Sequence, residues 1–116
     1  MPNEETTLQN LIMLALSDAG CTIWRNETSG AWVGKVIYKT GNQVTLTNAR
    51  MLSFGLAKGS SDIIGLSPTG RFMAIEVKTK SGRTSTDQRN FLQAVSKSGG
   101  IAGIVNSIEQ ALQLIE

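Results

Sequence analysis

The spacing of apolar residues predicts a helix over residues 5–19, near the start of the chain. Apolar side chains recur there every three or four residues, as on one face of a helix, and Gly20 marks the end. Glu4 and Glu5 fall at the first turn, where the helix dipole favours negative charge. The inward-facing positions of this helix are Leu8, Leu11, Ile12, Ala15 and Leu16.

Two later helices are each predicted by a capping box, in which a serine and a glutamine three residues apart bond each other's backbone. The first of them presents Phe91, Leu92 and Val95 to the core and stops at Gly99-Gly100. The capping pairs are Ser85 with Gln88 and Ser107 with Gln110, and the helices span residues 85–98 and 107–115.

Short runs rich in β-branched and aromatic residues predict the strands of an α/β fold, a small mixed sheet flanked by helices. The helix over residues 85–98 joins the last two strands, so these are expected to lie parallel. Residues 48–58 show no clear pattern and are expected to be a loop. The strands are predicted at Cys21–Asn26, Trp32–Lys39, Val44–Thr47, 62–66, Phe72–Lys78 and Ile101–Asn106.

A β-hairpin over residues 32–47 interrupts this order as an inserted arm. Its two strands flank Gly41-Asn42, a pair typical of a tight turn. Lys35 and Lys39 lie on the arm, so it either carries positive charge to a ligand or pairs with another subunit.

A second hairpin, turning at a Pro-Thr-Gly segment, carries the residues with candidate chemistry. If its strands pair so that Leu66 faces Phe72, then Asp62 faces Glu76 with Cβ atoms about 4.5–5.5 Å apart. Two carboxylates so close repel unless a cation or a shared proton lies between them. Lys78 lies on the same face as Glu76, because strand side chains alternate. The three charged groups form a candidate active site.

The composition limits the chemistry of this site. A chain of 116 residues is one domain, and the absence of a long apolar run or a basic leader predicts an intracellular protein. There is no histidine, and Cys21 is the one cysteine, which excludes histidine-based nucleophile chemistry and multi-thiolate zinc sites. Any metal would be held by oxygen, which favours magnesium, manganese or calcium.

The net charge is only +2, but the basic residues gather in two segments. Residues 28–61 hold four basic and no acidic side chains, and residues 71–97 hold six basic against two acidic ones. Such surfaces suit a polyanion, although a solvated basic face is the simpler interpretation of the charges alone.

An aspartate followed by Glu-x-Lys on the next strand is the arrangement of metal-dependent phosphodiester cleavage. Asp62 and Glu76 would hold a divalent cation, with the carbonyl of Val77 as a third ligand. The cation would polarise the phosphate and acidify a water, and Lys78 would orient that water or neutralise developing charge. The triplet alone is a weak signal, because a surface ion pair of about 0–1 kcal/mol would look the same.

Further segments follow in a specific order around this triplet: Glu5-x-x-Leu-Gln9, Trp24-Arg-Asn26, Phe54-Gly55, Lys58-Gly-Ser-Ser-Asp62, Ala74-Ile-Glu-Val-Lys78 and Gln88-x-x-Phe91 before Gly99-Gly100. Together they resemble a virus-type replication-repair nuclease (VRR-NUC) domain of the PD-(D/E)xK superfamily. The resemblance spans nearly the whole chain, residues 1–116, and implies a restriction-endonuclease-like core. Ser61 stands where the superfamily usually has proline, a backbone feature and not a ligand.

The resemblance implies a DNA nuclease that depends on Mg²⁺ or Mn²⁺. It makes Asp62 and Glu76 metal ligands, Lys78 catalytic and Glu5 the helix acid near the metal. Gln88 would contact the metal site or the phosphate, beside its capping role. Candidates for contact with DNA are Arg25, Asn26, Lys35, Lys39, Lys58, Ser61, Lys80 and Arg83.

Stand-alone copies of this domain resemble phage-encoded enzymes, and small superfamily members often act as dimers on branched DNA. We therefore expect a homodimeric, Holliday-junction-resolving endonuclease of DNA repair in a phage-infected or bacterial cytoplasm, held by phosphate and shape contacts. Two alternatives stay open: a monomeric nuclease for flaps, nicks or single strands, or half of a restriction-like enzyme; and a DNA- or metal-binding module without turnover. A nucleotide-binding module is disfavoured, because Gly59-Ser-Ser-Asp62 precedes a strand and not a helix.

Overall fold

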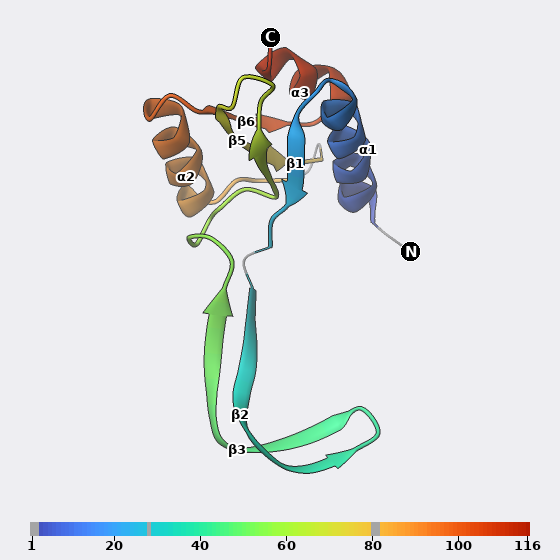
Figure 1. Ribbon diagram of the computed structural model, residues 1–116, viewed down its shortest axis with the longest axis vertical. Coiled ribbons are helices and arrows are strands. Elements are labelled where there is room, and N and C mark those ends of the chain that lie inside the picture. Colours follow the sequence, from blue (N-terminus) through green and yellow to red (C-terminus); the bar gives the residue numbers. More distant parts are fainter. Residues whose placement is uncertain (1–2, 28, 80–81) are drawn as a thin grey trace.

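The computed structural model describes residues 3–27, 29–79 and 82–116, which form a mixed α/β body and a protruding β-arm (Figure 1). The body matches the predicted fold class, and the arm is the predicted insertion. In chain order the elements are α1 (Glu4–Asp18), β1 (Thr22–Arg25), β2 (Ser29–Thr40), β3 (Gln43–Phe54), β4 (Ile63–Leu66), β5 (Phe72–Val77), α2 (Thr86–Lys97), β6 (Ile101–Val105) and α3 (Ile108–Leu114).

The body is built on a four-stranded sheet with the order β1-β4-β5-β6. The pairs β1–β4 and β4–β5 are antiparallel, whereas β5 and β6 are parallel and joined by α2, as predicted. Leu66 pairs with Phe72 and Ile63 with Ile75, so the predicted register is confirmed. Continuing this register by one residue sets Asp62 opposite Glu76 at the end of the ladder.

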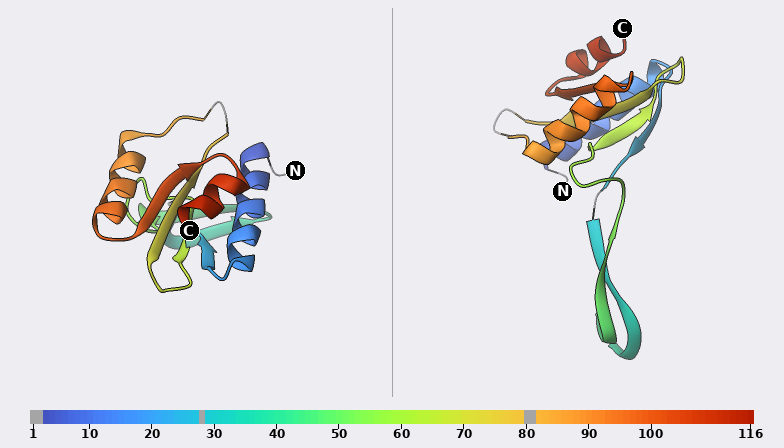
Figure 2. Two further views of the ribbon diagram at one scale, coloured as in Figure 1. Left: turned by 90° about the horizontal axis from the view of Figure 1, so that it is seen from above. Right: turned by 90° about the vertical axis from the view of Figure 1, so that its left-hand side faces the viewer.

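Helices cover both faces of the sheet (Figure 2). On one face α1 packs against β1 and β5 and α3 packs against β6, around a core that includes the fully buried Met73 and Ile75. The other face carries α2 beside β5 and β6. The predicted stripe on α1 is wrong at Leu11, which is 47% exposed. The buried line runs through Ile12 and Leu16, and neighbouring helix residues are turned about 100° apart, so Leu11 points to solvent.

The arm consists of β2 and β3, which pair with each other in a sheet of their own. Two register shifts interrupt the ladder, and the arm bends along its length (Figure 1). At the first shift Asn48 takes a positive φ of 54°, and a Cβ on Gly34 would lie 2.8 Å from the carbonyl oxygen of Thr47. The expected loop over residues 48–58 is therefore wrong for residues 48–54, which are strand. The bulge breaks the two-residue alternation by which a strand is detected.

The capping predictions hold fully for α2 and in part for α3. Ser85 and Gln88 form the reciprocal box, with bonds of 3.1 and 2.8 Å. At α3, Oγ of Ser107 accepts from the backbone N–H of Gln110, but the Gln110 side chain accepts from the backbone N–H of Asn106, one residue too early for the box.

No helix in the described ranges is long and apolar enough to cross a membrane.

Candidate active site

A polar cleft of about 550 Å³ lies where the β4–β5 ladder ends beside the first turn of α2. Asp62 and Gln88, two of the predicted site residues, line it. Its other lining residues, which the sequence did not single out as a set, are Asn26, Glu27, Ser29, Lys58, Gly59, Ser60, Ser85 and Asp87.

Glu76 lies on β5 next to this cleft and is only 1% exposed. Its Oε1 atom accepts a hydrogen bond of 3.2 Å from Nε2 of Gln88 and lies 3.8 Å from Nζ of Lys78. Its Oε2 atom is buried and has no hydrogen-bond partner among the described residues. A buried carboxylate oxygen without a partner costs free energy, so this atom is suited to a ligand that brings positive charge or a proton.

Asp62 is held just before the start of β4 by hydrogen bonds to backbone N–H groups. Its Oδ2 atom accepts a 3.0 Å bond from the N–H of Val77, and its carbonyl oxygen accepts one of 2.8 Å from the N–H of Asn26. The Asn26 amide also donates to Oγ of Ser60 at 2.8 Å and to the carbonyl oxygen of Ser61 at 2.9 Å. Asn26 thus positions the loop that carries Asp62.

The pKa of Glu76 is raised from 4.5 to about 8, first by burial of its carboxyl group and next by the carboxylate of Asp62 beside it. Lys78 opposes it, and the charge of Glu5 raises it further. Glu5 is half-buried in the first turn of α1, whereas Glu4 is exposed. Of these two acids, Glu5 is therefore the one whose charge reaches the site, although it stands on a different element.

The donor set fits a hard divalent cation such as Mg²⁺ or Mn²⁺. Asp62 and Glu76 offer carboxylate oxygens side by side, and the orphaned Oε2 of Glu76 is an open donor. The described part of the chain contains no group of three or more His, Cys, Asp or Glu side chains able to hold a metal. Further ligands would come from the carbonyl of Val77, from water and from a substrate phosphate, the mixed set that Mg²⁺ commonly takes.

The basic residues predicted to contact DNA are dispersed in the structure. Lys58 lines the cleft and pairs with Asp87 at 3.5 Å. Arg83 is exposed in the segment before α2. Lys35 and Lys39 are exposed on the arm, outside the residues that line the cleft.

Two other predicted contacts, Arg25 and Ser61, are placed within the fold. Arg25 donates hydrogen bonds to the side chains of Gln9 and Asn10 on α1, which occupies its guanidinium within the fold. Ser61 is fully buried, and no partner of its hydroxyl is found among the described residues. Lys80 lies outside the described residues. Pairings across many residues of sequence, such as Arg25 with α1, leave no local signal in the sequence.

Gly59 lines the cleft, but the sequence did not identify it as a site residue. Its backbone conformation shows why a glycine is needed there. Its φ is +84°, and a Cβ there would lie 2.5 Å from the carbonyl carbon of Asp87.

We expect Gly59→Ala to lower the free energy of unfolding by about 1–3 kcal/mol through overpacking, in addition to the backbone strain. It should also lower DNA cleavage, because the loop before Asp62 must move away from α2. Gly70→Ala is the matched control, with φ +87° and no described atom within 4 Å. Urea denaturation and cleavage rates compare the two, and equal losses in both variants would contradict the expectation.

The raised pKa of Glu76 also predicts a pH dependence of stability in the presence of EDTA. Folded protein keeps a proton that the unfolded chain releases above 4.5, so the free energy of unfolding should fall as pH rises from about 4.5 to about 8. Glu76→Gln, which has no proton to lose, should lack this fall. Urea denaturation of both proteins across this range measures it, and identical pH profiles would contradict the prediction.

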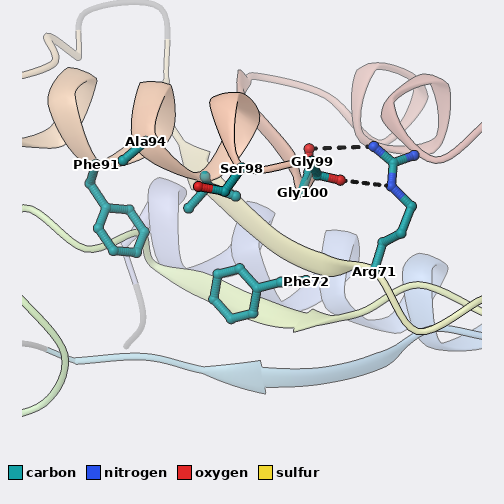
Figure 3. A pocket seen from close by; sticks show the side chains of 8 residues that line it. Arg71, Phe72, Phe91, Ala94, Ser98, Gly99 and Gly100 are labelled. Atoms are coloured by element: carbon teal, nitrogen blue, oxygen red, sulfur yellow. Dashed lines mark hydrogen bonds between the residues drawn. The ribbon is translucent and has the colours of Figure 1, made fainter.

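A second hollow, of about 470 Å³, lies at the other end of α2 and is chemically different (Figure 3). Phe72 and Phe91 point into it, and Arg71 closes one end by donating to the carbonyl oxygens of Gly99 and Gly100. Its lining residues include no acid. The polar cleft is therefore the candidate active site, because Asp62 and Gln88 line it and Glu76 and Lys78 lie beside them.

Comparison with protein families gives one match relevant to this geometry. Residues 42–109, more than half of the chain, match the model of the VRR-NUC domain. The matched segment contains Asp62, Glu76, Lys78 and Gln88, but it begins after α1 and β1, so the predicted resemblance near Glu5 lies outside it. Comparison with curated proteins gives no match.

Proposed function

The chain belongs to the VRR-NUC family of PD-(D/E)xK nucleases, and on this premise we propose that it is a divalent-metal-dependent endonuclease whose active site is the Asp62–Glu76 cleft. The family implies a nuclease with DNA as substrate. The observation that carries the proposal is the buried Glu76, which keeps one carboxylate oxygen unpartnered beside Asp62 and within 3.8 Å of the Lys78 ammonium.

A bound Mg²⁺ or Mn²⁺ supplies the positive charge that polarises a scissile phosphate and acidifies a water. The protein's own side chains prepare the site for it. Asp62 is fixed through Val77 and Asn26, and Gln88 holds one oxygen of Glu76, which leaves the other available. Lys78, 18% exposed, presents an ammonium that orients the attacking water or neutralises charge developing on the phosphate.

The preferred substrate is a four-way DNA junction, and the preferred assembly is a homodimer. Each chain carries one candidate site, so a two-fold pair would present two sites to two strands of one junction. Lys58 lines the cleft and brings positive charge to it, which suits contacts to DNA phosphates. Such an enzyme acts inside the cell, where branched DNA arises.

The test is a series of cleavage assays with junction, flap, nicked and linear DNA, each with Mg²⁺, Mn²⁺ or EDTA. The proposal expects paired incisions in the junction with either metal and none in EDTA. Cutting of flaps or nicks with junctions left intact would support the monomeric alternative and overturn junction resolution. Metal-independent binding without any cleavage would support a non-catalytic DNA-binding module and overturn the nuclease itself.

A further inference from the structure

The arm gives the chain an extended shape and an exposed apolar surface. The molecule measures 54 × 33 × 28 Å and its radius of gyration is 17.2 Å, against about 13 Å for a compact domain of this length. Figure 1 shows β2 and β3 projecting away from the body. The large apolar side chains exposed on the arm are Trp32, Val36, Ile37, Tyr38, Val44, Met51, Leu52 and Phe54.

A two-stranded hairpin of this kind is poorly stabilised when it stands alone. Within the described residues, β2 and β3 pair with each other and with no third strand. The accessible surface of the chain is 7731 Å², whereas a compact monomer of 12.4 kDa would expose about 6,100 Å². The excess of roughly 1,600 Å² is surface that a partner can cover.

We infer that the β2–β3 arm is the surface through which two copies of this chain associate. A stable dimer buries about 800 Å² on each partner, so the excess surface is sufficient for one. The apolar composition also favours a protein partner. Three basic residues, Lys35, Lys39 and Arg50, stand on the arm among eight exposed large apolar ones, whereas DNA-binding surfaces are polar and strongly positive. The inference rests on the proposed homodimer, but not on the proposed cleavage chemistry.

The outer half of the arm has two unlike faces. Residues paired across a ladder share a face, and the faces alternate along each strand. Val36 pairs with Leu46, so Val36, Leu46 and Val44 share a mainly apolar face, which Lys39 joins through its pairing with Val44. Thr45, between Leu46 and Val44, points to the opposite face, which its partner Tyr38 shares and which Thr40 and Gln43 join. The apolar face is the one expected to meet the second copy.

This difference between the faces provides a matched pair of variants. Val36→Glu/Val44→Glu places two carboxylates on the apolar face, and Thr40→Glu/Thr45→Glu places two on the polar face of the same strands. Light scattering coupled to size exclusion, in EDTA, measures their mass against wild type. Wild type and the threonine variant should have twice 12.4 kDa, and the valine variant 12.4 kDa. Circular dichroism verifies that each body is folded.

Each outcome separates this inference from the proposed function. A dimer that persists in the valine variant overturns the role of the arm and leaves a dimeric nuclease in place. A monomeric wild type overturns both the arm contact and the dimer, while metal-dependent cleavage by that monomer keeps the nuclease. If the valine variant keeps the mass of a dimer but loses DNA binding, the arm is a DNA-binding surface and the inference is also overturned.

If the valine variant fails to fold, hydrogen exchange of the wild-type protein provides the test. The arm amides should lose protection when the protein is diluted, and exchange rates that do not change on dilution would contradict the inference.

Discussion

Replacing Glu76 by glutamine is expected to lower metal-dependent DNA cleavage by at least about 10²–10³-fold. Glutamine keeps the size of the side chain and can still bond Gln88, but it loses the negative charge with which Glu76 would hold a cation. Because Glu76 is buried and one of its oxygens is unpartnered, the change should not unfold the protein in EDTA. Single-turnover cleavage with Mg²⁺ and with Mn²⁺ measures the effect.

The control for this variant is Glu109→Gln, the same change at an exposed acid in the first turn of α3. It should cleave like wild type. Thermal denaturation adds a second readout, because a cation that binds only the folded state raises the melting temperature. Wild type should be stabilised by Mn²⁺ and Glu76→Gln should not. Undiminished cleavage by Glu76→Gln would remove Glu76 from the site.

Replacing Lys78 by methionine is expected to slow cleavage by about 10²–10³-fold, while Mn²⁺ still stabilises the protein against heat. The ammonium lies 3.8 Å from Oε1 of Glu76 and is 18% exposed, so it reaches the substrate side of the site without being needed for the carboxylates. Methionine retains most of the aliphatic length. The loss should therefore fall on the rate constant of a single turnover at saturating DNA.

Lys97→Met, in the exposed last turn of α2, serves as the comparison for Lys78→Met. Both changes remove one positive charge, so both can weaken DNA binding slightly through the overall field. Only the Lys78 change should alter the rate at saturating DNA. If the two variants lose activity to the same degree, the role of Lys78 is general electrostatics and the catalytic assignment is wrong.

Much of the body could be predicted because its signals are local. The turn between β4 and β5 and the apolar runs around it determined the register, which in turn sets Asp62 opposite Glu76. The capping box at Ser85 and Gln88 positioned α2, and a helix between two strands required them to be parallel. The same glutamine closes the box with its oxygen and bonds Glu76 with its nitrogen, so both roles considered for it are compatible.

The remainder depended on contacts that sequence spacing does not contain. The rotation of α1, which exposes Leu11, follows from its packing on the sheet. Arg25 donates its hydrogen bonds to α1 side chains that are distant from it in sequence. Asn26 has the residue type of a DNA contact, yet its amide positions the Asp62 loop. Strand β3 was shortened in the prediction because the bulge at Asn48 hides its alternation.

The most direct test of the central claim is anomalous diffraction from crystals of the protein soaked in Mn²⁺. The claim is that Asp62 and Glu76 together hold a divalent cation beside Lys78. One strong anomalous peak is expected at direct ligand distance from Oε2 of Glu76 and from the Asp62 carboxylate, and it should be absent in Glu76→Gln crystals. A strong peak elsewhere, or none at these carboxylates at saturating Mn²⁺, would contradict it.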